Sequence, residues 1–176
     1  NYNATTGEVI KKKTAQGFAD ESAWGRGQAW GLYGYTETYR ETKEKKYLEQ
    51  ADKIAQYILS HPNFAKDKIT YWDFNAPDIP ASLRDASAAA IMASAFLELS
   101  EYVNKKKANQ YFKTAETILK NLSAADYKTA PGTNGGFIIK HCVGHMPNKT
   151  EIDVPLTYAD YYFVEAMMRY KKITGN

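Results

Sequence analysis

Cysteine is almost absent from this chain of 176 residues, which contains only Cys142. One thiol can form neither an internal disulfide nor a cysteine metal cluster, so we expect a buried free thiol. Long apolar runs are missing as well, and none approaches the roughly 18 residues that a membrane-spanning helix requires. The sequence therefore gives no reason to expect a membrane partner.

An excess of one charge is also lacking, because 23 Lys and Arg residues face 20 Asp and Glu residues. This balance gives no basis for a nucleic-acid partner, and the run 11–13 is interpreted as a solvated loop. His141 and His145 are spaced four apart, but Gly144 and Pro147 disfavour the helix that would bring them together, and no third ligand is evident. We expect neither a metal nor a cofactor.

Aromatic residues are abundant at 14%, and the densest group is Trp24-Gly25-Arg26-Gly27-Gln28-Ala29-Trp30. Indole faces stack on the C–H surfaces of sugars, and a guanidinium fork matches a carboxylate or a sulfate. The alternative is a buried aromatic pair whose Arg26 binds a carboxylate of the protein. The residue types alone leave both interpretations open.

Apolar periodicity, capping residues and prolines predict five helices, at about 22–42, 44–60, 85–102, 109–122 and 157–173. We expect a turn or hairpin over 1–20, a loop over 61–84, and an irregular stretch over 123–156 with a short strand at 137–139. Asp20 or Ser22, Asp85, and Thr157 with Asp160 are the predicted helix caps.

The helices repeat at a shift of 64 residues, which carries Tyr47-Leu48 onto Tyr111-Phe112 and Ala29 onto Ala93. Each unit is therefore a helical hairpin with a small-residue first helix and an amphipathic second helix, a pattern typical of solenoids and toroids. Glycines at 27, 31 and 34 predict close backbone approach or room for a ligand, because each glycine costs a helix about 1 kcal/mol. The predicted fold is all-α, about half of a six-hairpin α/α toroid, with 1–176 as its second, C-terminal half.

Four segments together resemble the unsaturated glucuronyl hydrolase family. They are Asp20 to Gly34 (DESAWGRGQAWGLYG), Tyr71-Trp72-Asp73-Phe74, Arg84 to Ala90 (RDASAAA) and Tyr158 to Phe163 (YADYYF). The resemblance runs from about Asn3 to Arg169 and matches the C-terminal half of a family member. It implies an (α/α)6 bacterial glycosidase that removes a 4,5-unsaturated uronic acid from the non-reducing end of oligosaccharides made by polysaccharide lyases.

The resemblance also implies an unusual reaction, in which an Asp protonates C4 of the vinyl ether and activates the water that adds at C5. The resulting hemiketal collapses and releases the neighbouring sugar. The matching substrate-binding positions are Gln16, Trp24, Arg26 and Trp30. No catalytic residue is assigned, because the family's catalytic aspartates lie in its N-terminal half, and Ala15 stands where members often carry His.

The remaining carboxylates have simpler interpretations. Asp20, Asp85 and Asp160 are expected to cap helices, and Arg84 with Asp85 to form a local ion pair. Asp73 is expected to order its loop through backbone N–H groups, although a contact with sugar hydroxyls stays open.

Two other functions compete with this interpretation. One is an unsaturated rhamnogalacturonyl hydrolase acting on pectin fragments, which tends to carry Asn-Gly where this chain has Gln28-Ala29. The other is a non-catalytic sugar-binding helical repeat. The exact oligosaccharide and the compartment, bacterial cytoplasm or periplasm, stay open. Because residue 1 is Asn and not Met, we expect the natural N-terminus to lie upstream, and we expect the missing N-terminal half or a second copy as partner.

Overall fold

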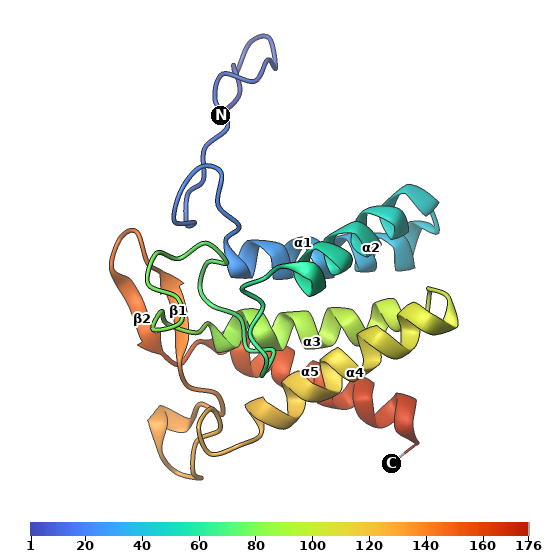
Figure 1. Cartoon of the computed structure of the whole chain (residues 1–176), viewed down its shortest axis with the longest axis vertical. Coiled ribbons are helices and arrows are strands. Elements are labelled where there is room, and N and C mark those ends of the chain that lie inside the picture. The colour runs from blue at the N-terminus through green and yellow to red at the C-terminus, as the bar shows by residue number, and fades with distance from the viewer. Residues whose placement is uncertain (176) are drawn as a thin grey trace.

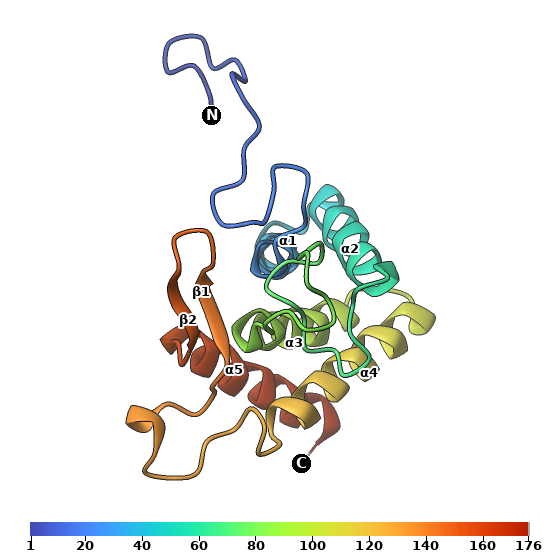
Figure 2. The ribbon, with the colours of Figure 1, turned by 60° about the vertical axis from the view of Figure 1, so that its left-hand side comes forward.

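The computed structural model describes residues 1–175, which form five helices and a β-hairpin (Figure 1). The elements are α1 (Gly25–Thr42), α2 (Lys45–Ser60), α3 (Ala86–Ser100), α4 (Lys105–Leu122), β1 (Cys142–His145), β2 (Thr150–Val154) and α5 (Thr157–Thr174), with a short 3₁₀ turn at Asn134–Gly136. The segment before α1 projects away from the helices in Figures 1 and 2. Within the described residues, no helix combines the length and apolarity needed to cross a membrane.

The helices form two rows, and α1, α3 and α5 lie side by side in the first of them (Figure 2). The second row holds α2, which packs on α1, and α4, which packs on α3. The two predicted hairpins are therefore present, followed by one further inner helix. Positions related by the 64-residue repeat are equally buried. Ala29 and Ala93 are fully buried, and so are Ala51 and Ala115.

Helix α3 lies in the middle of the inner row, and every residue from Ala86 to Leu99 is buried. Its small side chains allow α1 and α5 to approach it from both sides, and ring contacts between Trp30 of α1 and Tyr162 of α5 join those two helices. Burial on all sides explains why α3 is apolar around its whole circumference, unlike the amphipathic α2 and α4.

The glycines of α1 do not serve close approach between helix backbones. A Cβ atom at Gly27 would meet the Trp24 indole at 2.6 Å, and one at Gly31 would meet the Ile54 side chain at 3.2 Å. A Cβ atom at Gly34 would meet nothing within 4 Å. The expectation of backbone contact at this stripe is therefore wrong, and Gly27 instead leaves room for an indole of its own helix.

Gly25 is the glycine of α1 that a backbone contact requires. Its N–H donates to the carbonyl of Trp72 at 2.9 Å, and a Cβ atom there would lie 2.4 Å from the carbonyl oxygen of Tyr71. We expect Gly25→Ala to lower the free energy of unfolding by about 2 kcal/mol, because the loop must move away. Gly34→Ala is the matched control and should raise it by about 0.5–1 kcal/mol. Urea unfolding of both variants measures their free energies of unfolding. Equal changes in the two variants would contradict the close contact between Gly25 and the loop.

Two predicted elements need correction and one is confirmed. Helix α4 begins at Lys105 and not at about 109, because Asn104 caps it by accepting the N–H of Lys107 at 3.1 Å. The expected strand at 137–139 is only an isolated bridge between Ile139 and Lys128, while the real hairpin follows at β1 and β2. The N-terminal turn or hairpin is confirmed by the bridge between Tyr2 and Val9.

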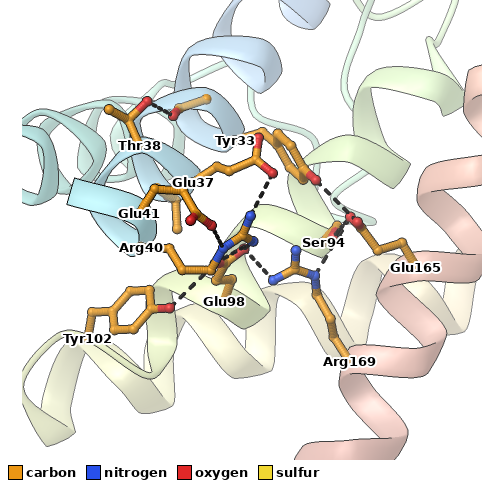
Figure 3. Close-up of polar contacts among 12 residues, drawn as sticks. Tyr33, Glu37, Thr38, Arg40, Glu41, Ser94, Glu98, Tyr102, Glu165 and Arg169 are labelled. Carbon is orange, nitrogen blue, oxygen red and sulfur yellow. Dashed lines mark hydrogen bonds and ion pairs between the residues drawn. The ribbon is translucent and has the colours of Figure 1, made fainter. Parts of the chain in front are cut away.

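The C-terminal parts of the inner helices share a group of charges that surrounds the buried carboxylate of Glu98 (Figure 3). The Glu98 carboxylate of α3 is 4% exposed and accepts hydrogen bonds from Arg40 of α1, at 3.0 Å, and from Arg169 of α5. Glu165 of α5 accepts the hydroxyl of Tyr33 at 3.1 Å. These residues connect the three inner helices at the end away from the β-hairpin.

Candidate functional site

The aromatic and charged residues of the first motif lie where the N-terminal ends of α1 and α3 meet the β-hairpin. Arg26 is at the centre of this group and is only 4% exposed. Its Nη1 donates to Asp85 at 2.7 Å and to the carbonyl of Val143, and its Nη2 donates to Gln16 at 3.0 Å and to the carbonyl of Gly144. All four terminal N–H groups of the guanidinium are therefore in use, and only the Nε–H is left over.

Asp85 has two functions in this group. One oxygen forms the buried ion pair with Arg26, and the other accepts the N–H of Ser87 at 3.1 Å, which caps α3 as predicted. The predicted local pair between Arg84 and Asp85 is wrong. Arg84 instead bonds Asp67 at 3.4 Å, because its side chain leads away from the α3 terminus and lies over the ring of Tyr71.

The two indoles of the motif lie on either side of Arg26 along α1. The guanidinium lies 4.9 Å from the ring centroid of Trp24, in cation–π geometry. Trp30 contacts Tyr158 and Tyr162 of α5, with ring centroids 6.3 and 5.1 Å apart. Both indoles are partly exposed, so the group offers aromatic surface beside a fixed charge pair.

The β-hairpin supplies the two carbonyl groups that hold Arg26. Gly144 allows this, because a Cβ atom there would lie 2.4 Å from the Glu151 carboxylate, on the opposite strand. At the hairpin base, the Nδ1 atom of His141 lies 2.6 Å from Asp153. His145 accepts the N–H of Asn148 at 3.2 Å. The two histidines therefore have separate partners within the hairpin, and the described residues contain no group of three that could ligate a metal.

The other carboxylates near the site order the backbone. Asp73 is fully buried and accepts the N–H of Phe18 at 2.9 Å and the hydroxyl of Ser22 at 2.7 Å, which confirms the loop-ordering interpretation. Asp20 is not a helix cap, because it bonds the N–H of Thr14, and Trp24 occupies the cap position of α1.

The predicted cap at the start of α5 is also wrong. Helix α5 begins at Thr157 as expected, but Leu156 occupies its cap position and no side chain bonds there. The two oxygens of Asp160 accept the N–H groups of Ile138 and Ile139, both at 2.8 Å. Asp160 therefore fastens the irregular segment before the hairpin to α5.

Tyr158 also belongs to this group, although its position in the sequence did not predict it. Its ring lies 5.5 Å from the Arg26 guanidinium and also contacts Trp30. Burial raises the pKa of Tyr158 to about 12, so its hydroxyl stays protonated at neutral pH and can donate a hydrogen bond. The signal was present, because Tyr158 opens the fourth motif, but spacing in the sequence does not show that α5 reaches α1.

The arrangement places aromatic faces, an amide and a phenol hydroxyl around the ion pair of Arg26 and Asp85, whose charges cancel. Aromatic faces and neutral hydrogen-bonding groups suit a polyhydroxylated ligand. Gln16, Trp24 and Trp30 all lie within this group. A ligand carboxylate could accept the Nε–H of Arg26, or it could take the place of Gln16 as acceptor of the Nη2–H.

Comparisons with known proteins agree on one family, although no family model matches the chain. The chain is 47% identical to a protein of Formosa agariphila named unsaturated glucuronyl hydrolase. The match covers 96% of the chain and 42% of that relative. The chain is 32% identical to a protein of the same name from Bacillus sp. strain GL1, over 99% of the chain and 46% of the relative. The chain therefore spans less than half the length of the curated relatives it matches.

A solved structure gives the same result. The chain matches a structure described as an unsaturated glucuronyl hydrolase specific for heparin with a TM-score of 0.96 and 51% identity, over 99% of the chain and 47% of that structure. The helical rows described above are thus part of an α/α toroid, which confirms the predicted fold class.

Proposed function

Because the chain belongs to the unsaturated glucuronyl hydrolase family over the length that it covers, we propose that its complete polypeptide removes a 4,5-unsaturated uronic acid from the non-reducing end of lyase-generated oligosaccharides. The reaction is hydration of the vinyl ether: a carboxylic acid protonates C4, and water adds at C5. The hemiketal then opens and releases the neighbouring sugar. The single observation that carries the proposal is the TM-score of 0.96 with 51% identity to a member of that family.

In this proposal Gln16, Trp24 and Trp30 contact the terminal sugar through an amide and two indole faces. Arg26 has a mainly positioning role, because Asp85 and two carbonyls fix its guanidinium and it in turn fixes Gln16. Burial of this charge pair keeps the group rigid, and preorganised groups stabilise a transition state without moving. The hydroxyl of Tyr158 adds a further hydrogen-bond donor on the same side.

The acid that protonates C4 belongs to the part of the polypeptide outside these 176 residues. The support is that the site's buried carboxylates already have structural partners. Asp85 binds Arg26 and caps α3, and Asp73 orders the loop before α1. Carboxylates whose oxygens already bind groups of the protein are not free to reach C4 of a substrate.

The rest of the polypeptide also covers the outer face of α5 in this proposal. Helices α1 and α3 each have an outer partner, whereas α5 exposes apolar side chains. They are Tyr161 at 60%, Val164 at 43%, Met167 at 42% and Met168 at 68% exposed. Contiguous apolar surface of this kind marks an interaction site. Residues 1–176 are then one half of a single catalytic toroid.

Turnover of an unsaturated disaccharide, followed as loss of the absorbance of its conjugated double bond, tests the proposal. We expect the 176-residue chain alone to be inactive, and a polypeptide extended to the length of its relatives to be active. Turnover by the short chain would show that one of its own carboxylates, such as Asp73, Asp85 or Asp153, is catalytic. Inactivity of the extended polypeptide on every unsaturated disaccharide offered would contradict the proposed reaction.

A further inference from the structure

The Trp30 indole receives little support from its own helix. Its neighbours one turn away on α1 include Gly27 and Gly34, which have no side chains to pack against the ring. Its ring contacts come from α5 instead, where Tyr158 and Tyr162 lie against it. Building on the proposed function, we propose that Tyr162 is a positioning residue, which holds the Trp30 indole in the orientation that the sugar requires.

Tyr162 lies between two aromatic residues of α1 that are one turn apart. Its ring packs edge-to-face on Trp30, with ring centroids 5.1 Å apart and an interplanar angle of 75°. It packs in the same way on Tyr33, at 5.0 Å and 77°. Aromatic rings favour this arrangement, because the positive edge of one ring meets the negative face of the other. The Tyr162 ring therefore restricts the rotation of the indole from the side of Tyr33.

Tyr33 is itself held by hydrogen bonds, which Figure 3 shows. Its hydroxyl donates to Glu165 of α5 at 3.1 Å, and Glu165 also accepts the hydroxyl of Ser94 from α3. Burial raises the pKa of the Tyr33 hydroxyl, which therefore stays protonated and donates at neutral pH. Glu165 is three residues after Tyr162, so one turn of α5 carries both the ring and the carboxylate that hold the side chains of α1.

A fixed indole is of use to a sugar-binding site. Ordering a mobile side chain on binding costs free energy, and a ring that is already fixed avoids that cost. Trp30 lies four residues after Arg26, whose guanidinium is fixed by Asp85 and by carbonyls of the hairpin. Tyr162 gives the aromatic part of the site the same rigidity. Loss of its ring should therefore weaken substrate binding, while the proton transfer, which the proposed function assigns to the rest of the polypeptide, proceeds as before.

The test measures hydrolysis of an unsaturated disaccharide by the complete polypeptide. Tyr162→Leu should raise KM about fivefold and leave kcat nearly unchanged, because the indole contacts the sugar alike in the ground state and the transition state. Tyr162→Phe keeps the ring and loses only a hydroxyl that has no hydrogen-bond partner among the described residues. This conservative variant should therefore have the KM of the wild type.

Tyr33→Phe is a milder variant that gives a second measurement. It keeps the ring that contacts Tyr162 and loses the hydrogen bond to Glu165. We expect KM to rise about twofold, because the Tyr33 ring is then held less firmly against Tyr162.

Tyr170→Leu is the matched control. Tyr170 also lies on α5 and stacks on a ring, that of Phe112, with centroids 5.5 Å apart, but Trp30 is not among its ring contacts. The control should lower stability and leave KM unchanged. An unchanged KM in Tyr162→Leu and Tyr33→Phe, or equal increases in Tyr162→Leu and Tyr170→Leu, would overturn the inference while the proposed function stands. Failure of the wild type to consume any unsaturated disaccharide would overturn the proposed function, and this inference with it.

Discussion

Replacing Asp85 with alanine is expected to lower the free energy of unfolding by about 3–5 kcal/mol. The carboxylate is fully buried, and its loss would leave the Arg26 charge buried without a counter-ion. The same change removes the cap at the start of α3, where the carboxylate accepts the N–H of Ser87. Both losses act in the same direction, and urea unfolding of the chain measures their sum.

Asp67→Ala is the matched control for Asp85→Ala. Asp67 pairs with Arg84 at 3.4 Å, but its side chain is 41% exposed, so we expect a loss of about 1 kcal/mol or less. Asp85→Asn separates the two functions, because an amide oxygen still accepts the N–H of Ser87 but carries no charge. A loss below about 1 kcal/mol for Asp85→Ala would show that the Arg26 guanidinium finds another anion.

Replacing Glu98 with alanine should have an effect of similar size, about 3–5 kcal/mol, at the other end of the inner helices. Its carboxylate is 4% exposed and lies between two guanidinium groups, those of Arg40 and Arg169. Without it, the guanidinium groups of Arg40 and Arg169 lose the anion that they share, although Arg40 keeps Glu37 and Glu41 and Arg169 keeps Glu165 (Figure 3). The variant should therefore lose stability through the lost ion pairs and hydrogen bonds.

Glu37→Ala provides the control for this second variant, because Glu37 binds the same Arg40, at 2.8 Å. Its side chain is 42% exposed, and exposed pairs contribute about 0–1 kcal/mol. Similar losses of unfolding free energy for Glu37→Ala and Glu98→Ala would contradict the inference that Glu98 contributes more because it is buried. A double replacement of Glu98 and Arg169 by residues of similar volume should recover part of the loss, since it removes one of the two charges that Glu98 neutralises.

The helices could be predicted from the sequence because their signals are local. Apolar periodicity gave α2 to within one residue at its start, and His61-Pro62 marked its end. The repeat of 64 residues identified two helical hairpins, because equivalent positions must pack in equivalent ways. The start of α4 was missed because the lysines at 105–107 look like a solvated turn, although Asn104 caps them as a first helical turn.

The β-hairpin could not be predicted, since its strands lack the usual alternation. Glu151 and Asp153 adopt positive φ angles of 53° and 56°, and a register shift between Cys142 and Val143 interrupts the ladder. The partners of Arg26 were equally hidden. Asp85 is 59 residues away and the hairpin carbonyls are more than 110 residues away, and only the packing of α1, α3 and β1 brings them together.

The complete burial of α3 restricts how this protein can vary. From Ala86 to Leu99 no position faces solvent, and most of its neighbours are side chains of α1, α4 and α5. Any larger residue in the alanine-rich first turns would push α1 and α5 apart and disturb the contacts that hold Arg26. Substitutions that retune substrate preference are therefore expected in the loops and the hairpin, while the middle helix accepts little beyond exchanges between alanine, serine and glycine.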